Sequence, residues 1–130
     1  MYVENFKDLE VYKLARELSY KIFVLSKRFP KEELYSLTDQ IRRSSRSVGA
    51  NIAEAWGKRR YEAHFISKLT DSDAEQLETQ HWVDNALECE YISKDEAKNL
   101  IENYLAVGRM LNSMINKSGT FCNPERRRDY

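Results

Sequence analysis

Apolar residues recur at every third or fourth position over four long segments of the chain, which is the spacing of an amphipathic α-helix. The first segment spans about Asp8 to Arg28, and Pro30 ends it because the residue before a proline is pushed out of the α region. Its apolar positions are Val11, Leu14, Leu18, Ile22, Leu25 and Phe29. We therefore expect a first helix with one stripe that faces a core.

Three further helices are expected after Pro30. The second runs from about Ser36, where Ser36-Leu37-Thr38-Asp39 has a weak N-terminal capping pattern, to about Lys58. The third spans about Tyr61 to Glu90, and the fourth opens at the capping box Ser93-Lys94-Asp95-Glu96 and runs to Asn116. The predicted face of the third helix contains Phe65, Ile66, Leu69, Leu77, Val83, Leu87 and Tyr91, with polar residues at its middle.

Long helices joined by short connections pack as antiparallel neighbours. The pattern therefore predicts an all-α protein, an antiparallel up-down-up-down four-helix bundle, over residues 1–118. No alternation typical of a β-strand competes with this prediction. Residues 119–130, which contain Pro124 and Arg126-Arg127-Arg128, are predicted to be a flexible C-terminal tail.

A polar stripe runs beside the apolar stripe of the second helix when the residues are placed at about 100° intervals. This pattern is typical of a helix that buries hydrogen-bonding groups against a partner. An antiparallel third helix would bring its own polar residues to this stripe. The predicted polar network contains Ser47, Asn51, Glu54, Asp73, Gln76 and Gln80. It either fixes the register of the two helices or forms a catalytic or metal cluster.

Composition limits the class of protein. Hydrophobic residues make up 42% of the chain and charged residues 32%, as in ordinary globular domains. There is no apolar run of about 18 residues and no secretory signal at the N-terminus, so a membrane protein is not expected. Cys89 and Cys122 lack metal-binding spacing and are interpreted as reduced thiols, which predicts a cytoplasmic location.

The net charge is zero, but the charge is unevenly distributed. Residues 42–60 contain six basic residues and one acidic residue, a net charge of +5, whereas residues 71–102 contain ten acidic and two basic residues, a net charge of −8. The candidate nucleic-acid-binding residues are Arg42, Arg43, Arg46, Lys58, Arg59 and Arg60. Trp56 or Tyr61 could stack on an unpaired base. Alternatively, these basic residues pair with the acidic residues of the third helix or of a neighbouring subunit.

The sequence gives little support for a catalytic site or a metal-binding site. Ferritin-like metal sites need Glu-x-x-His on two helices, and Glu78-Thr79-Gln80-His81 has that spacing without a second copy. Two histidines do not complete a nucleophile–base pair, and there is no glycine-rich phosphate loop. We therefore expect no enzyme activity, no cofactor and no bound metal.

Small residues and tryptophans indicate a surface for self-association. Small side chains let a second helix approach closely, and an exposed tryptophan is a common interface anchor. The predicted oligomer interface contains Gly49, Ala53, Trp56 and Trp82.

Several segments together resemble one known family, the bacterial four-helix bundle proteins related to those encoded in 23S ribosomal RNA intervening sequences. The segments are Phe6 to Tyr12, Phe29 to Arg43, Ser47 to Glu54 and Leu77-Glu78-Thr79-Gln80, and the most specific parts are the Phe-Pro-x-Glu motif and Asn51-Ile52-Ala53-Glu54. The resemblance implies a left-handed bundle that forms a homopentamer in the bacterial cytosol. The biochemical role of the family is generally unassigned. More distant accessory proteins of diversity-generating retroelements share the fold and bind nucleic acid and a reverse transcriptase.

These observations together predict a non-enzymatic, homo-oligomeric four-helix bundle that acts as a nucleic-acid-associated adaptor. The alternative is a structural or protein-partner module without nucleic-acid binding, in which the acidic third helix neutralises the basic residues.

Overall fold

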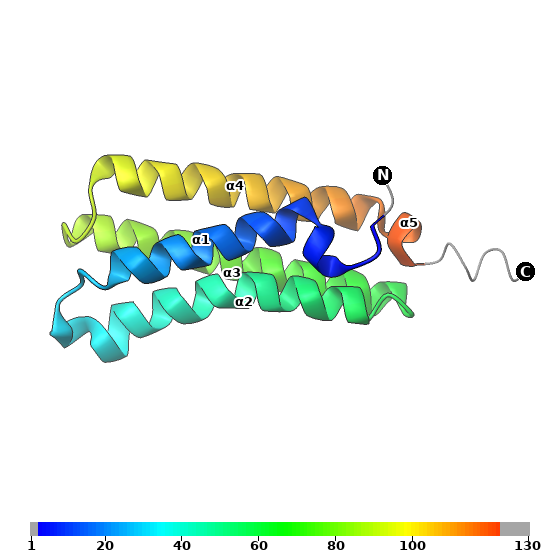
Figure 1. Ribbon diagram of the computed structural model, residues 1–130, viewed down its shortest axis with the longest axis horizontal. Coiled ribbons are helices and arrows are strands. Elements are labelled where there is room, and N and C mark those ends of the chain that lie inside the picture. Colours follow the sequence, from blue (N-terminus) through cyan, green and yellow to red (C-terminus); the bar gives the residue numbers. More distant parts are fainter. Residues whose placement is uncertain (1–2, 123–130) are drawn as a thin grey trace, which may run out of the picture.

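Four long α-helices lie side by side along one axis in the computed structural model, which describes residues 3–122 (Figure 1). They are α1 (Glu10–Ser26), α2 (Asp39–Gly57), α3 (Glu62–Glu88) and α4 (Lys94–Asn116). A short helix, α5 (Ser118–Cys122), follows α4. Helices α1 and α3 each pack mainly on α2 and α4. The described residues contain helices and no strand, which confirms the predicted all-α class.

The connection from α1 to α2 and the connection from α3 to α4 are joined at one end of the bundle (Figure 1). The Tyr91 hydroxyl donates a hydrogen bond to Glu33 at 2.9 Å, and the Arg28 guanidinium donates to Glu96 at 2.7 Å. Hydrogen bonds from the hydroxyls of Ser36 and Tyr91 lower the pKa of Glu33. The same bond to the carboxylate raises the pKa of Tyr91 to about 12. These contacts tie the two connections together.

The start of the second helix differs from the prediction. A 3₁₀ turn, η2 (Lys31–Glu33), and a π-helical turn, η3 (Leu34–Thr38), precede α2, so the expected start at Ser36 lies inside the π-helical turn. The Glu33 carboxylate accepts hydrogen bonds from the backbone N–H of Leu37 and from the Ser36 hydroxyl, which stabilises this wider turn. The capping box that opens α4 is confirmed, because Ser93 and Glu96 each accept a hydrogen bond from the other's backbone N–H.

The predicted tail needs a correction at its start, because residues 119–122 belong to α5. The Phe121 ring lies 5.8 Å from the Phe65 ring and 6.4 Å from the Trp56 ring, measured between centroids. The Ser118 hydroxyl donates to the Glu62 carboxylate at 2.5 Å. Burial of Phe121 between two aromatic rings provides the apolar contact that holds this segment on the bundle. Residues 123–130 of the predicted tail lie outside the described residues.

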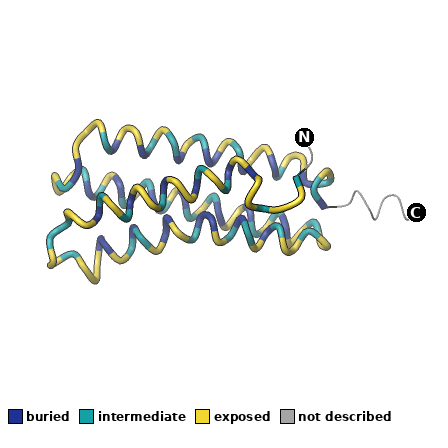
Figure 2. The backbone as a smooth tube through the Cα atoms, in the orientation of Figure 1, coloured by how far each residue is buried: buried dark blue, intermediate teal, exposed yellow. Residues whose placement is uncertain are grey.

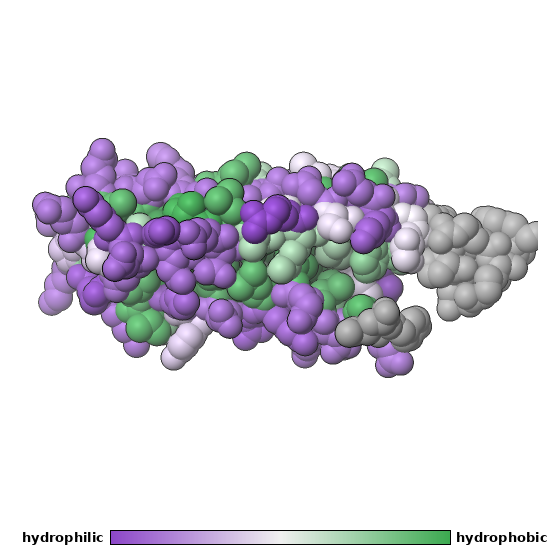
Figure 3. Space-filling view, turned by 90° about the horizontal axis from the view of Figure 1, so that it is seen from above, coloured by the Kyte–Doolittle hydropathy of each residue, from purple (hydrophilic) through white to green (hydrophobic). Residues whose placement is uncertain are grey.

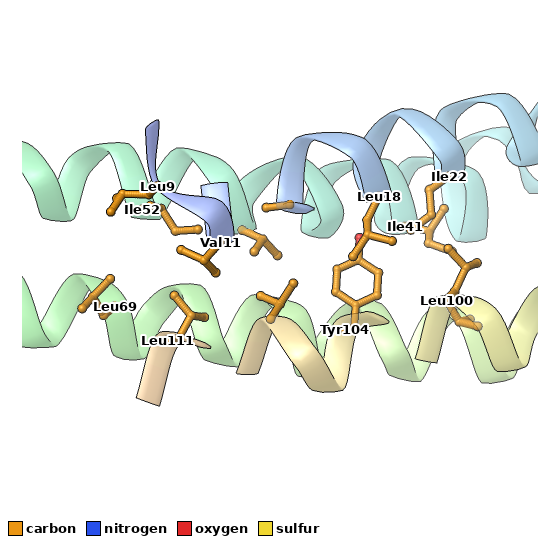
Figure 4. Packing of buried hydrophobic residues seen from close by; sticks show 14 of the residues in the cluster. Leu9, Val11, Leu18, Ile22, Ile41, Ile52, Leu69, Leu100, Tyr104 and Leu111 are labelled. Carbon is orange, nitrogen blue, oxygen red and sulfur yellow. The ribbon is translucent and has the colours of Figure 1, made fainter. Parts of the chain in front are cut away.

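Buried positions recur on the inner side of each long helix, as Figure 2 shows. Figure 4 shows part of the resulting core, to which all four long helices contribute leucine or isoleucine side chains, with Leu18 beside the ring of Tyr104. The outer face shown in Figure 3 is mostly hydrophilic, with apolar patches along its middle. Within residues 3–122, none of the helices combines the length and the apolar character that crossing a membrane requires.

The seam between α2 and α3 is made of small polar side chains. The Ser72 hydroxyl donates to the backbone carbonyl of Val48 at 2.8 Å, and the Thr79 hydroxyl lies 2.9 Å from the Ser44 hydroxyl. All three hydroxyl-bearing residues are fully buried. Leu77, which was predicted to face the core, is 55% exposed. The prediction fails there because the apolar stripe of α3 is interrupted and Ser72 and Thr79 take the inward positions.

The Tyr104 hydroxyl is buried and has no hydrogen-bond partner within residues 3–122, and burial raises the pKa of this phenol. A buried polar group without a hydrogen-bond partner lowers the stability of the fold, because it loses its hydrogen bonds to water and gains none in return. We expect Tyr104→Phe to raise the free energy of unfolding by about 1 kcal/mol, measured by urea unfolding. Tyr35→Phe is the matched control and should change nothing, because Tyr35 is 89% exposed. Destabilisation by Tyr104→Phe would contradict the expectation.

Candidate nucleic-acid interface

Three cations surround the ring of Phe23 where α1 and α2 lie side by side, and a fourth lies over the ring of Tyr12. The Arg42 guanidinium carbon lies 4.9 Å from the centroid of the Phe23 ring, and that of Arg46 lies 5.6 Å from it. The Lys27 ammonium lies 4.7 Å from the same centroid. About two turns before Phe23 on α1, Arg16 donates to the Tyr12 hydroxyl at 3.0 Å. We call Arg16, Lys27, Arg42 and Arg46 the groove cations.

None of the groove cations forms an ion pair with a carboxylate in the part of the chain that the structure describes. The Nε of Arg42 donates instead to the Ser26 hydroxyl at 2.7 Å, and Ser26 is buried. Arginine and lysine over an aromatic ring keep their full positive charge, because the ring attracts the cation without neutralising it. The groove therefore carries positive charge that can attract an anion.

Helical periodicity explains why the groove forms here. Tyr12, Arg16, Phe23 and Lys27 are separated by steps of four, seven and four residues and so share one side of α1. On α2, Arg42 and Arg46 are one turn apart and face α1. Neither helix alone combines these residues, and the packing of α1 against α2 brings Arg42 and Arg46 of α2 over the Phe23 ring of α1.

A hollow of about 710 Å³ lies beside the groove cations, between α1 and α2. Its α1 side includes Tyr20, which is 67% exposed, and its α2 side consists of the small residues Gly49, Ala50 and Ala53 together with Arg46. A Cβ on Gly49 would lie 3.6 Å from the Tyr12 ring, so that glycine already contacts an aromatic side chain of α1. The lining contains no acidic residue.

The six basic residues expected from the sequence do not form one patch. Arg43 pairs with Glu75 at 3.5 Å and with Glu78, so it is neutralised by α3. Arg59 donates to the backbone carbonyl of Trp56 at 2.8 Å, and its guanidinium lies 3.7 Å from the Trp56 ring centroid. Lys58 and Arg60 are exposed beyond the C-terminal end of α2. Of the six residues, only Arg42 and Arg46 belong to the groove cations.

Sequence reasoning missed Arg16, Lys27 and Tyr20 because it considered basic residues on the second helix alone. A signal for them exists in the sequence, since Arg16 follows Tyr12 by four residues and Lys27 follows Phe23 by four. A repeated aromatic–cation pair on one side of α1 could have indicated this face before the structure was available.

The predicted polar network divides into the three residues of α2, of which Glu54 pairs separately from Ser47 and Asn51, and the three residues of α3. Asn51 donates to the backbone carbonyl of Ser47 at 2.9 Å, and Glu54 pairs with Lys68 at 3.2 Å. The other three residues form a ladder on α3, described next. Hydrogen bonds within residues 3–122 do not join these two sets, because Ser72 and Thr79 are the α3 residues that face the α2 seam. The predicted link between the sets is wrong for this reason.

The ladder on α3 faces α4. Gln80 donates to Gln76 at 2.7 Å, and Gln76 donates to Asp73 at 2.9 Å. Gly108 of α4 lies opposite, where a Cβ would come within 3.0 Å of the Gln76 amide nitrogen. The glycine thus leaves room for a buried glutamine, which is only 3% exposed.

A second hollow, of about 610 Å³, lies over this ladder between α3 and α4. Leu77 of α3 and Leu105 of α4 line it, and they are 55% and 46% exposed. Two large apolar side chains on opposite sides of one hollow are an unusual exposure for a monomer with a charged surface. These two leucines, rather than Trp56 and Trp82, are therefore the exposed apolar residues that could contact a second copy.

Both tryptophans of the predicted oligomer interface are half-buried. Trp56 is half-buried between Arg59 and Phe121, and Trp82 donates to Glu78 at 3.0 Å and lies against His81. Of the other two predicted interface residues, Gly49 is buried against Tyr12 and Ala53 lines the α1–α2 hollow. The exposed pair of tryptophans expected from the sequence is therefore not present.

The side chains of residues 3–122 are not arranged in a way that would bind a metal ion. This range contains no group of three or more His, Cys, Asp or Glu side chains placed to hold an ion. Glu78, the first residue of the one Glu-x-x-His motif, binds Arg43 and Trp82 instead.

Comparisons with known proteins give one family. A family model described as 23S rRNA-intervening sequence protein matches residues 7–113. A crystal structure from Bacteroides thetaiotaomicron VPI-5482, described as a protein with unknown function from the S23 ribosomal protein family, is similar in structure, with a TM-score of 0.73. It shares 30% sequence identity with this chain, and the match covers 82% of this chain and 95% of that chain. The search of curated proteins gave no match.

The Glu78 cluster gives a prediction about pH. Hydrogen bonds from Trp82 and from Arg43 lower the pKa of Glu78. A carboxylate with a lowered folded-state pKa stabilises the fold above its unfolded-state pKa, and this contribution is lost as the pH falls through the folded-state pKa. We expect Glu78→Gln to lower the free energy of unfolding at pH 7 by about 0.5 kcal/mol, because solvent screens this partly exposed pair.

Urea unfolding over a pH series measures this effect. The difference between Glu78→Gln and the wild type should vanish below the folded-state pKa, where the wild-type carboxyl is also neutral. Glu102→Gln is the matched control, since Glu102 is exposed on α4 and forms no ion pair with any described residue. A difference that is the same at every pH would contradict the assigned role of the charge.

Proposed function

Since the chain belongs to the 23S rRNA-intervening sequence protein family, we propose that it is a non-enzymatic adaptor that binds nucleic acid through the groove between α1 and α2. We take the bundle to be up-down-up-down and left-handed, and the protein to act in the cytoplasm as a homo-oligomer. The resemblance to this family implies five copies.

The observation that carries the proposal is the set of four groove cations without carboxylate partners. Nucleic acids present a row of phosphates, and each lysine or arginine that contacts a phosphate releases a bound counterion and so favours association. The groove cations are distributed over two helices, which suits a strand that passes along the groove.

A net charge of zero is compatible with this proposal, because several acidic residues form ion pairs with basic residues of the same chain. Glu75 and Glu78 pair with Arg43, and Glu54 and Asp71 pair with Lys68. No acidic residue lines the α1–α2 hollow. Local charge at the groove, rather than the total for the chain, decides whether a phosphate is attracted.

Self-association is a second function, and a different observation favours it. Leu77 and Leu105 remain exposed at the α3–α4 hollow, where a second copy would remove them from water. In the bundle, the α3–α4 side lies opposite the α1–α2 side, since each of these helices packs mainly on its two neighbours. Oligomerisation through this side would leave the groove cations accessible.

Nucleic-acid binding is tested with the double variant Arg42→Gln and Arg46→Gln. We expect weaker binding to a fluorescently labelled single-stranded RNA, and a slope of log K against log salt that is smaller by about 1.4, at roughly 0.7 for each lost phosphate contact. Fluorescence anisotropy at several salt concentrations measures both. Arg43→Gln is the matched control and should bind like the wild type, because Arg43 already pairs with α3. Equal losses in the two proteins would count against the groove.

Self-association is tested by light-scattering mass. We expect a wild-type mass near five chains and a lower mass for the double variant Leu77→Glu and Leu105→Glu, because two charges would have to be desolvated in the contact. Leu34→Glu, at a leucine that is 46% exposed in the π-helical turn, is the control and should keep the wild-type mass. A monomeric wild type would refute self-association and leave the nucleic-acid proposal standing.

A further inference from the structure

We propose that the hollow between α1 and α2 holds one unpaired nucleobase, so that the protein recognises single-stranded or bulged nucleic acid rather than a continuous duplex. This inference rests on the proposed nucleic-acid function and names the part of the ligand that enters the groove. Neither the charge of the groove cations nor the family match assigns such a pocket.

The aromatic residue available for stacking is Tyr20. Its side chain is 67% exposed and lines the hollow, whereas the neighbouring Phe23 ring is already covered by Lys27, Arg42 and Arg46. The two rings are 6.4 Å apart between centroids and tilted by 37°. Phe23 thus positions the cations, and Tyr20 offers an open face to a planar ligand.

The opposite side of the hollow leaves space for that ligand. Gly49, Ala50 and Ala53 carry no side chain longer than a methyl group, so Arg46 is the one long side chain that α2 contributes to the described lining of the hollow. The volume of about 710 Å³ lies within the range of sites that take small organic molecules. The flat face of an aromatic heterocycle fits this combination of an aromatic wall and a small-residue wall.

The polar groups around the hollow suit a base with phosphates on either side. Arg16 and Arg46 line it with guanidinium groups that can donate hydrogen bonds to phosphate, and the described lining contains no carboxylate that would repel phosphate. The Ser19 hydroxyl donates to the backbone carbonyl of Arg16 at 3.0 Å, so its oxygen remains an acceptor for a base edge. One acceptor gives little discrimination among bases, and we expect weak sequence preference.

A continuous duplex would use only part of this surface. Its phosphates could meet the groove cations, but its bases stay stacked on one another and would leave the hollow unfilled. An unpaired base adds stacking on Tyr20 to the same phosphate contacts. The geometry therefore favours single strands, loops and bulges.

Binding of three RNAs of equal length to the full-length protein tests the inference. They are a single strand, a blunt duplex and a single strand with abasic sites at its centre, and the abasic strand has the same phosphates but lacks the central bases. We expect affinity to fall by roughly 5- to 100-fold from the single strand to the abasic strand, as is typical when one stacked base is lost. A single-stranded DNA of the same sequence shows whether the site also distinguishes the sugar.

Two variants locate the effect at the hollow. Tyr20→Ala removes the stacking face and Ala53→Trp fills the space, and both should lower single-strand affinity to about that of the abasic strand without changing duplex affinity. The matched controls are Tyr35→Ala, at an 89% exposed tyrosine away from the groove, and Ala74→Trp, at an exposed alanine of α3. Circular dichroism confirms that each variant is folded.

The outcomes separate this inference from the proposed function. If Arg42→Gln with Arg46→Gln weakens binding but Tyr20→Ala and Ala53→Trp do not, nucleic acid binds the cations and the base pocket is wrong. If the wild type binds no nucleic acid, the proposed function itself is wrong. If Ala53→Trp changes the light-scattering mass and not the RNA affinity, the hollow belongs to a contact between subunits and the inference is overturned.

Discussion

The hydrogen bonds across the α2–α3 seam fix how both helices are rotated about their own axes. Ser72 reaches the backbone carbonyl of Val48 at 2.8 Å, and Thr79 reaches the Ser44 hydroxyl at 2.9 Å. A slip or rotation of either helix would take the Val48 carbonyl away from the buried Ser72 hydroxyl, at a cost of about 1–3 kcal/mol. Apolar stripes alone tolerate small rotations, because hydrophobic contact is not directional. The seam therefore sets the rotation of α2 and α3, and this rotation determines which of their residues face the other helices.

The rotation of α2 about its axis determines what each of its arginines contacts. With Ser44 and Val48 turned toward α3, Arg43 comes to lie beside Glu75 and Glu78, where its charge is neutralised. Arg42 lies about 100° and Arg46 about 60° from Arg43 in the same sense around the helix, and both come to lie over Phe23 of α1. Adjacent residues with the same chemistry thus have opposite roles, one in stability and one in the proposed binding of phosphate.

The rotation of α3 creates the second surface. Since Ser72 and Thr79 face α2, the ladder of Asp73, Gln76 and Gln80 turns toward α4, where Gly108 leaves room for it. In the proposed function, the α3–α4 side carries the contact between copies and the opposite α1–α2 side carries the nucleic acid. An adaptor that assembles through one side and binds through the other needs this separation, because the two ligands then do not compete for the same residues.

The sequence by itself determined the four helices, their approximate ends and the capping box at Ser93, because periodicity and capping are local properties of the chain. It also indicated that Arg42 and Arg46 carry accessible charge. It could not predict that α5 packs through Phe121, that both tryptophans are half-buried, or that Arg43 is neutralised while Arg16 and Lys27 complete the groove. Those features depend on which side of one helix meets which side of another. Only the tertiary structure decided them, because the rotation of each helix is set by hydrogen bonds and close packing between residues far apart in the chain.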